Sequence, residues 1–507
     1  MTTQITKTAR NATAIALSTL LARGIQFGWA ILLAGKLGAD GFGLYGVISG
    51  LIATAATLPE FGMGLIVLRD VAQRPTQAGR YLTATFAIQP LLAILAYIVL
   101  ILWGILFNFE MTTRLLLVMG GLSLIIDTLG NMCYNQLIAV ERMVTTSVIL
   151  IIHILLLVSF AFAALSSGGG LPALYVATVL AGTLRVAMFW VAMHRAGIKL
   201  EWPLDFTIVR KLFRDGTPIA LSGFFGLAYQ YVDRFLLIVF LGDTVLGHTQ
   251  AAYLSAAFLI VFGVIEIVNT TVLTAIFPAM SRMVFEMSSL RAVTDQIAFL
   301  TLVITLPIAI GISTLAAKVS ELLFPNLIGT AAVLQILIWH SVVAMVGNIY
   351  AQQMLIENKQ TRMVIIRGVS LVVSTCCNML LLPTIGVQGA GIAALISASV
   401  ALIWFLLEHH MSMQEARMLG GRSLRVIAAG VIMAACILFA RNFNPILAGI
   451  FGSFAYLGSI VMLRVLSPQE WMIIRNALGS LPVIGPRLQQ SMSRLLDKAV
   501  LPSEIIS

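Results

Sequence analysis

Seven charged side chains stand inside long apolar runs of this chain. They are three arginines and four acids: Arg23, Arg185, Arg234, Glu60, Asp127, Asp233 and Glu266. Charged groups at membrane depth are costly, so those that occur face a cavity or a partner of opposite charge. Arginine cannot neutralise itself by losing its proton, and its planar guanidinium pairs bidentately with phosphate. These residues therefore indicate a binding site for a charged solute.

Amide side chains accompany these charges at helical spacing. Gln26 follows Arg23 by three residues. Asn131 follows Asp127 by four. Such spacings place side chains on one face of a helix, which predicts a polar cavity, although amides also serve as hydrogen-bonding contacts between packed helices. The candidate substrate-binding residues are Arg23, Gln26, Asp127, Asn131, Arg185, Gln230, Asp233, Arg234 and Glu266, and Glu60 is a gating candidate near a helix end.

The composition indicates an all-α integral membrane protein. Hydrophobic residues make up 59% of the 507 residues and charged residues only 10%, whereas soluble domains carry about 25% charged residues. Long apolar runs without alternation predict membrane-spanning helices. The net charge of +10 is better explained by membrane orientation than by nucleic acid, which we do not expect as a partner. The four cysteines lack metal-binding spacing, so we expect no metal site.

The apolar runs predict about fourteen spans. With the N-terminus inside, cytoplasmic segments hold 24 Lys and Arg residues and external segments only four. This asymmetry predicts a multi-pass protein of the cytoplasmic membrane with both termini cytoplasmic. The predicted spans cover 12–35, 42–66, 81–107, 113–138, 144–166, 171–194, 216–241, 248–278, 296–317, 329–354, 363–383, 388–410, 424–440 and 446–466.

Two further stretches are amphipathic. Segment 195–215 places Phe206, Val209 and Leu212 opposite basic residues, and segment 467–507 repeats leucines at helical spacing. We expect both to lie along the cytoplasmic surface of the membrane, the alternative being ordinary cytoplasmic linkers.

The sequence also contains an internal repeat. TAIALS (13–18) returns as TPIALS (217–222), and Leu37-Gly38 falls on Leu241-Gly242 at the same separation of 204 residues. GNMCYNQ (130–136) returns as GNIYAQQ (347–353), 217 residues later. Copies six spans apart share one orientation, as in transporters built from parallel repeats. We therefore expect two pseudo-symmetric six-helix lobes, 1–194 and 216–411, joined by linker 195–215 and followed by spans 13–14 (412–466) and the tail.

The chain lacks the sequence motifs of several enzyme classes. The chain has no G-x-x-x-x-G-K-[ST] phosphate loop, no H-E-x-x-H and no nucleophile elbow. We therefore expect a protein that is not an enzyme.

Four segments, in this order, carry a family resemblance: LGADGFGLYGVIS (37–49), DRFLLIVFLG (233–242), FPAMSR (277–282) and GVQGAGIAAL (386–395). They resemble the polysaccharide-transporter family of lipid-linked oligosaccharide flippases, which includes O-antigen flippases and belongs to the multidrug/oligosaccharidyl-lipid/polysaccharide exporter superfamily. The resemblance implies two six-helix lobes that work by alternating access on a polyprenyl-diphosphate-linked glycan, without a bound cofactor. It also implies that Arg23 and the Asp233–Arg234 pair belong to the cavity.

Other functions stay open at this point. The four acids outnumber the three arginines inside spans, which would suit an ion-coupled multidrug exporter of the same superfamily. A lipid II flippase is a nearer alternative, and a membrane glycan polymerase is disfavoured by short external loops. Besides the glycan, membrane lipids and other membrane proteins of polysaccharide assembly are candidate partners, and we expect a monomer.

Single cysteines in a Cys-free variant test the topology. Because basic residues concentrate on one side, an impermeant reagent added outside should label Gly168→Cys and Thr244→Cys. It should leave Asp205→Cys and Leu495→Cys unlabelled. Labelling of Asp205→Cys from outside would contradict the fourteen-span arrangement.

Overall fold

A computed structural model describes residues 2–282, 287–409, 413–441, 444–467 and 470–471. Within those ranges the chain contains helices and no strand, which confirms the predicted all-α class. Thirteen helices there are long and apolar enough to cross a membrane. Of the predicted tail 467–507, residues 472–507 lie outside the described residues.

The first half of the chain forms α1 (Thr2–Ala55), α2 (Thr57–Glu60), α3 (Met63–Gln73), the 3-10 helix η1 (Pro75–Gln77), α4 (Ala78–Leu106), α5 (Met111–Ala139), α6 (Met143–Ser166), α7 (Gly170–Arg195) and α8 (Phe206–Leu241).

The second half continues with helices of similar length. They are α9 (Val245–Arg282), α10 (Met287–Thr314), α11 (Ala316–Leu323), α12 (Thr330–Ile356), α13 (Gln360–Ile385), α14 (Val387–His409), α15 (Met413–Ala440) and α16 (Pro445–Met462). The chain divides into two compact units. Unit 1 comprises Met1–Gly263, Ser320–Leu337 and Asn358–Ala401, and unit 2 comprises Val264–Val319, Ile338–Glu357 and Leu402–Ser507. The predicted lobe boundaries stay a prediction.

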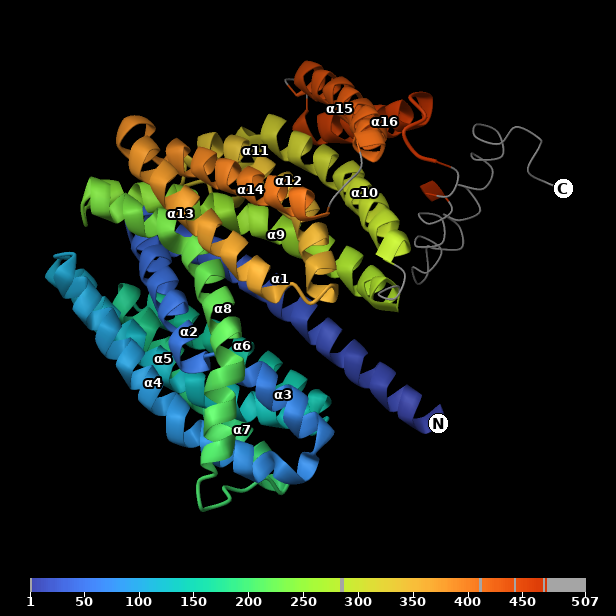
Figure 1. The fold of residues 1–507 in the computed structure, drawn as a ribbon. Helices are drawn as coiled ribbons and strands as arrows, with labels where there is room; N and C mark the ends of the chain where they lie inside the picture. Colours follow the sequence, from blue (N-terminus) through green and yellow to red (C-terminus); the bar gives the residue numbers. More distant parts are fainter. Residues whose placement is uncertain (1, 283–286, 410–412, 442–443, 468–469, 472–507) are drawn as a thin grey trace. The chain divides into compact units, whose positions relative to one another are not determined.

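Unit 1 contains most of the predicted site residues. Its helices α4 and α5 run side by side, α7 packs against α5 and α6, and α13 packs along α8 (Figure 1). A buried core joins α3, α4, α5, α7 and the start of α8, with Met63, Leu82 and Phe189 almost fully enclosed. This packing holds the helices that carry the candidate site.

Unit 2 encloses a polar network as well as an apolar core. Helices α10, α15 and α16 pack around Val426 and Ile437. Separately, Asp295 Oδ1 lies 3.0 Å from both the Tyr350 hydroxyl and His409 Nε2, and His409 Nδ1 lies 2.7 Å from Gln353 Oε1. Buried polar groups are thus paired with one another.

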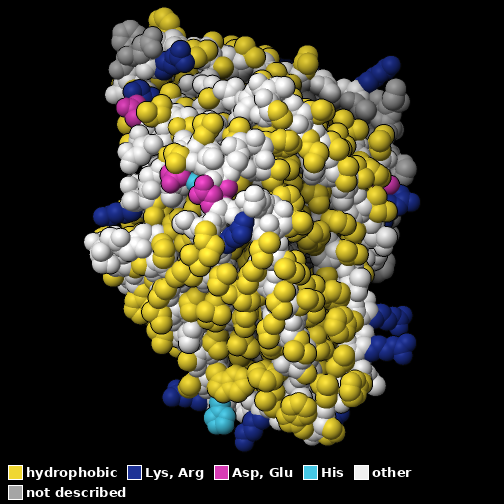
Figure 2. Space-filling view, turned by 90° about the vertical axis from the view of Figure 1, so that its left-hand side faces the viewer, with side chains coloured by type: hydrophobic (Ala, Val, Ile, Leu, Met, Phe, Trp, Pro, Cys, Tyr) yellow, Lys and Arg dark blue, Asp and Glu magenta, His cyan; other side chains and the backbone are white. Residues whose placement is uncertain are grey.

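The surface is as apolar as a membrane protein requires. Large hydrophobic side chains are strongly exposed on α4, for example Leu91, Leu102 and Leu106. Figure 2 shows a face on which hydrophobic side chains predominate, while most of its Lys and Arg side chains lie toward the margins. This distribution is stable in hydrocarbon and would be unfavourable in water.

The first predicted span and the first part of the second form one bent helix, α1, and the second predicted span continues through α2 into α3. The apolar segment Arg23–Glu60 contains 38 residues, about 57 Å of helix against a hydrocarbon core of about 30 Å. Within α1 the backbone leaves helical geometry at Gly38, with φ 68° and ψ −173°. This segment therefore accounts for two predicted spans, which explains why thirteen candidate helices stand against fourteen predicted ones.

Matching backbone breaks recur at the repeat separations. Gly242, 204 residues after Gly38, ends α8 with φ 83° and ψ 163°. Asn358, 217 residues after Glu141, has φ 59° against 61° for Glu141. The first separation equals that of the TAIALS copies, and the second equals that of the GNMCYNQ and GNIYAQQ segments. These coincidences support the predicted duplication.

The amphipathic stretch of the predicted linker forms the first turns of α8, which continues to Leu241. Part of its apolar face packs against protein, because Ile208 and Leu212 belong to the core of unit 1. Phe206 on the same stretch is exposed. The position of this stretch along the membrane surface stays a prediction.

The glycine at each break can be tested by substitution. Gly38 and Gly242 occupy a backbone region almost restricted to glycine, where another residue costs about 1–3 kcal/mol. We expect Gly38→Ala and Gly242→Ala each to lower the thermal unfolding midpoint of the purified protein. Gly28→Ala is the control, because Gly28 lies in α1 without positive φ and with open space around it. Equal midpoints for Gly38→Ala and Gly28→Ala would refute the proposed strain.

Candidate functional site

An apolar chamber of about 710 Å³ lies within unit 1, between helices of the two sequence repeats. Helices α1, α2 and α4 line one side, and α8 and α13 line the other. Aromatic residues contribute much of the lining: Phe61, Trp103, Phe107, Phe224, Tyr231 and Phe235. Three of them form a cluster in which the Phe235 ring lies 5.5 Å from Trp103 and 4.9 Å from Phe107.

The threonine hydroxyl groups in this lining are already satisfied. Thr54, Thr57, Thr217 and Thr375 each donate to a carbonyl three or four residues earlier, at 2.7–2.9 Å. A hydroxyl bonded to its own helix offers little to a ligand. The chamber is therefore suited to hydrocarbon rather than to a sugar.

A polar cluster lies beside one end of α8 and contacts both repeats. In this His248 cluster, His248 Nδ1 lies 2.7 Å from Asp40 and Nε2 lies 2.7 Å from Asp243. Asp243 also accepts hydrogen bonds from the Glu110 amide and the Thr113 hydroxyl. Only a protonated imidazole can donate from both nitrogens. Burial raises the pKa of Asp243, but these hydrogen bonds outweigh it and lower the pKa overall.

A second cluster lies near the start of α8. In this Asp70 cluster, the Asp70 carboxylate lies 2.5 Å from Lys211 Nζ and accepts from the Tyr81 hydroxyl and Arg69 Nε, each at 2.8 Å. Arg69 also reaches Asp215 on α8 at 3.2 Å. Burial raises the pKa of Asp70, yet the three donors bring it down to about 2. The carboxylate is therefore ionised at neutral pH.

Next to each cluster, glycines allow neighbouring chain segments to pack closely together. A Cβ on Gly43 would meet the His248 carbonyl oxygen at 1.7 Å. A Cβ on Gly216 would meet the Phe61 oxygen at 2.4 Å, and one on Gly62 would meet Ile219 at 2.6 Å. Glycines thus allow close approaches of neighbouring chain segments beside both clusters.

The structure pairs two of the predicted site residues. Arg185 on α7 donates to Asp127 on α5, with 2.7 Å between Nη2 and Oδ1. The Arg185 side chain is 11% exposed and that of Asp127 is 47% exposed. The guanidinium lies against Gly130, where a Cβ would approach Nη2 to 2.8 Å. In the repeat, Gly347 instead faces Phe405, so only the first copy carries the ion pair.

Asp233 and Arg234 on α8 are both buried. The Arg234 guanidinium lies 5.0 Å from the centre of the Tyr231 ring and 4.7 Å from that of Phe258. It donates to the Gln230 carbonyl at 3.1 Å and to the Ser255 hydroxyl at 3.0 Å. Because Tyr231 lines the chamber, Arg234 lies behind a chamber wall rather than in the open space.

The remaining predicted residues lie on separate helices. Arg23 and Gln26 are exposed on α1, and Asn131 is exposed on α5. Glu60 is the exposed last residue of α2, and Glu266 is half-buried on α9 in unit 2. The described contacts thus bring together Asp127 with Arg185 and Gln230 with Arg234. A single cavity for all ten residues stays a prediction.

Sequence reasoning missed Arg367. This exposed residue of α13 donates from Nη1 to the Ser222 hydroxyl at 2.9 Å and to the Ser222 carbonyl at 3.2 Å. Leu371, one turn further along α13, and Leu221 line the chamber. Arg367 therefore places a cation beside the apolar space. Its place inside the predicted span 363–383 was the available signal, but Arg367 is counted among the 24 cytoplasmic basic residues and not among the charges inside spans.

The helices, the apolar exterior and the chamber define a multi-pass membrane protein of the transporter type. The chain belongs to the polysaccharide biosynthesis protein family, whose model matches residues 8–284, more than half of the sequence.

Individual relatives agree with this assignment. A probable low-salt glycan biosynthesis flippase of Haloferax volcanii, Agl15, is 22% identical over 410 residues, covering 80% of this chain and 83% of the relative. The fold is similar to that of the lipid II flippase MurJ in an inward closed conformation, with a TM-score of 0.70, 13% identity and coverage of 88% and 98%. It is also similar to an inward-facing multidrug resistance transporter of the MATE family, with a TM-score of 0.62, 14% identity and coverage of 79% and 97%.

Substitution of the ion pair should show an asymmetry. Asp127→Asn leaves the buried Arg185 without a counter-charge, which we expect to cost about 1–3 kcal/mol of stability. Arg185→Met should cost less, because the exposed Asp127 can be hydrated or take up a proton, whereas arginine cannot lose one. Thermal unfolding of both variants and the double variant measures this order. A greater loss for Arg185→Met would contradict it.

Proposed function

We propose that this protein is a flippase that moves a polyprenyl-diphosphate-linked oligosaccharide across the cytoplasmic membrane for cell-surface polysaccharide assembly. The observation that carries this proposal is the apolar chamber between the two repeats, whose threonine hydroxyl groups are satisfied within their own helices. Such a lining offers a hydrophilic solute few hydrogen-bonding partners. A hydrocarbon chain is favoured there by about 25 cal/mol for each Å² of apolar surface that it buries.

Two exposed arginines suit the diphosphate of such a lipid. Arg367 is exposed next to the chamber residues Leu221 and Leu371, and its fork-shaped guanidinium matches phosphate oxygens. Arg23 is a second exposed arginine, on α1. We assign these two cations to head-group binding, and Arg234 to support of the Tyr231 wall.

Alternating access would use the two polar clusters. The His248 cluster and the Asp70 cluster each connect α8 or its following turn to helices of the first repeat. We infer that separation of one cluster opens one end of the chamber while the other stays closed. The cycle would transport the lipid without chemical change, so the protein acts as a transporter rather than an enzyme.

The proposed function also implies an orientation of the protein in the membrane and a set of partners. The distribution of basic residues supports a cytoplasmic location for both termini and for the start of α8, so Arg367 would meet the substrate from that side. The protein would act as a monomer alongside other membrane proteins of polysaccharide assembly. The relative Agl15 is described as a probable glycan biosynthesis flippase, which supports a glycan cargo over a drug.

Transport by arginine variants tests this function. In a strain without the native gene, we expect Arg367→Gln to reduce surface glycan about tenfold or more, because it removes a charge-assisted contact. Arg23→Gln should act in the same direction, and Arg367→Lys should keep part of the activity. Arg210→Gln removes an exposed cation from α8 as the control, with membrane abundance measured for every variant.

The same transport experiments distinguish a surface glycan, lipid II and drugs as the transported substrate. Full glycan display by the Arg23→Gln, Arg367→Gln double variant at normal abundance would refute the head-group assignment. Restored peptidoglycan synthesis in a strain depleted of its lipid II flippase, without effect on surface glycan, would replace the cargo with lipid II. Drug resistance without either effect would identify an exporter.

A further inference from the structure

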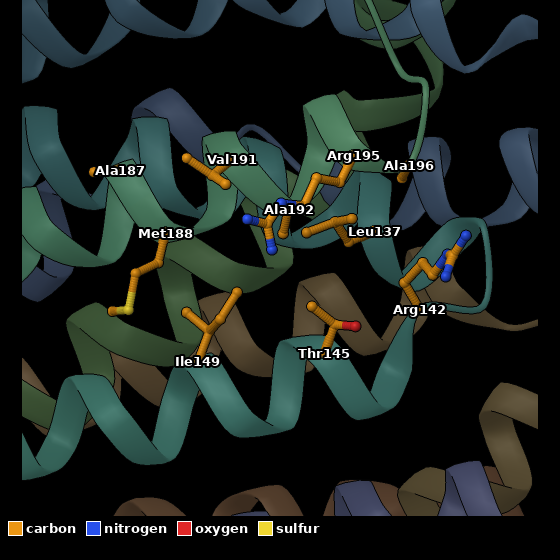
Figure 3. Close-up of a pocket in the computed structure, with 10 residues that line it drawn as sticks. All are labelled: Leu137, Arg142, Thr145, Ile149, Ala187, Met188, Val191, Ala192, Arg195 and Ala196. Carbon is orange, nitrogen blue, oxygen red and sulfur yellow. The ribbon is translucent and has the colours of Figure 1, made fainter.

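A second pocket, of about 570 Å³, lies among the ends of α5, α6 and α7 (Figure 3). It has no lining residue in common with the apolar chamber. Three of its lining residues are polar, namely Arg142, Thr145 and Arg195, and the others are aliphatic or methionine. The pocket therefore combines two cations with an apolar wall.

The cations and the apolar residues are spread along the pocket. In Figure 3 Arg142 lies at the right, the nitrogen atoms of Arg195 lie nearer the middle beside Ala192, and Ala187 and Met188 lie at the left. Along α7 the eight-residue step from Ala187 to Arg195 corresponds to about 12 Å. A ligand that fills the pocket therefore meets two cations and an apolar stretch that continues past Arg195.

Both guanidinium groups are available to such a ligand. Arg142 and Arg195 are exposed, and among the described residues neither forms an ion pair. By contrast, Arg69 and Arg185 are paired with carboxylates. The charged or titratable neighbours in sequence are Glu141, His194 and Lys199, all exposed. Two cations facing one pocket favour an anionic ligand.

We propose that this pocket binds an anionic phospholipid, with its phosphate between Arg142 and Arg195 and an acyl chain along Ala187, Met188 and Val191. Basic pockets between membrane helices bind such head groups, and the cytoplasmic leaflet is the anionic one. The predicted topology places the α5–α6 turn and the end of α7 at that leaflet. The site does not depend on the proposed cargo, because it is separate from the chamber.

Native mass spectrometry of the purified full-length protein tests the site with dioleoyl phosphatidylglycerol and dioleoyl phosphatidylcholine as probes. We expect the wild type to bind phosphatidylglycerol more tightly. The Arg142→Gln, Arg195→Gln double variant should lower that affinity about tenfold or more. Arg142→Lys, Arg195→Lys should retain part of it, which separates lost charge from misfolding. The control Arg74→Gln, Arg210→Gln removes two exposed arginines that have no ion pair among the described residues and should leave the affinity unchanged.

Two further arms distinguish a lipid from a soluble anion. Ala187→Phe fills the apolar end without changing charge and should also weaken phosphatidylglycerol binding. Glycerol 3-phosphate, which has no acyl chain, should not compete. Competition by glycerol 3-phosphate, or an equal loss of affinity in the Arg74→Gln, Arg210→Gln control, would overturn the lipid site. Because binding is measured directly, failure here is independent of failure in glycan transport.

Discussion

A polar group that leaves water must find its partner within the protein, and in a membrane this constraint acts on almost every helix. The threonines of the chamber meet it through their own backbone carbonyls. Arg185 meets it through Asp127, and Arg234 through Gln230, Ser255 and two aromatic rings. Because these groups are satisfied locally, the space between α1, α4, α8 and α13 is left to apolar side chains. The apolar character of the chamber therefore follows from the local hydrogen bonds and ion pairs of the polar side chains around it.

The duplication is preserved in the backbone more than in the chemistry. Gly38 and Gly242 break their helices in the same way, and Glu141 and Asn358 turn the chain in the same way. Side chains at matching positions have diverged, since an arginine contacts Gly130 whereas an aromatic ring contacts Gly347. A few residues with positive φ fix where each repeat breaks or turns its helices. Side chains that pack against each other can be replaced together without changing those turns.

Fold class and span positions could be predicted because they depend on composition and on runs of apolar residues. The candidate charges could be named from the sequence because a charged residue within an apolar run is conspicuous, but their role in substrate binding stays a prediction. The pairing of Asp127 with Arg185 could not be read from the sequence, because it depends on how α5 packs against α7. Arg367, His248 and Asp70 were missed for a related reason. Each lies near a predicted span end, where a polar residue is unremarkable until its partner on another helix is known.

The continuous length of α8 has a mechanical consequence. This helix has 36 residues, about 54 Å of backbone, and Pro218 within it does not interrupt the assigned helix. Lys211 of the Asp70 cluster lies near its start, and Asp243 of the His248 cluster follows its end. If the chamber opens as proposed, a helix of this length would act as a lever between the two clusters. A small tilt that separates the contacts at one end would press the other end inward, so one helix would couple the two proposed openings.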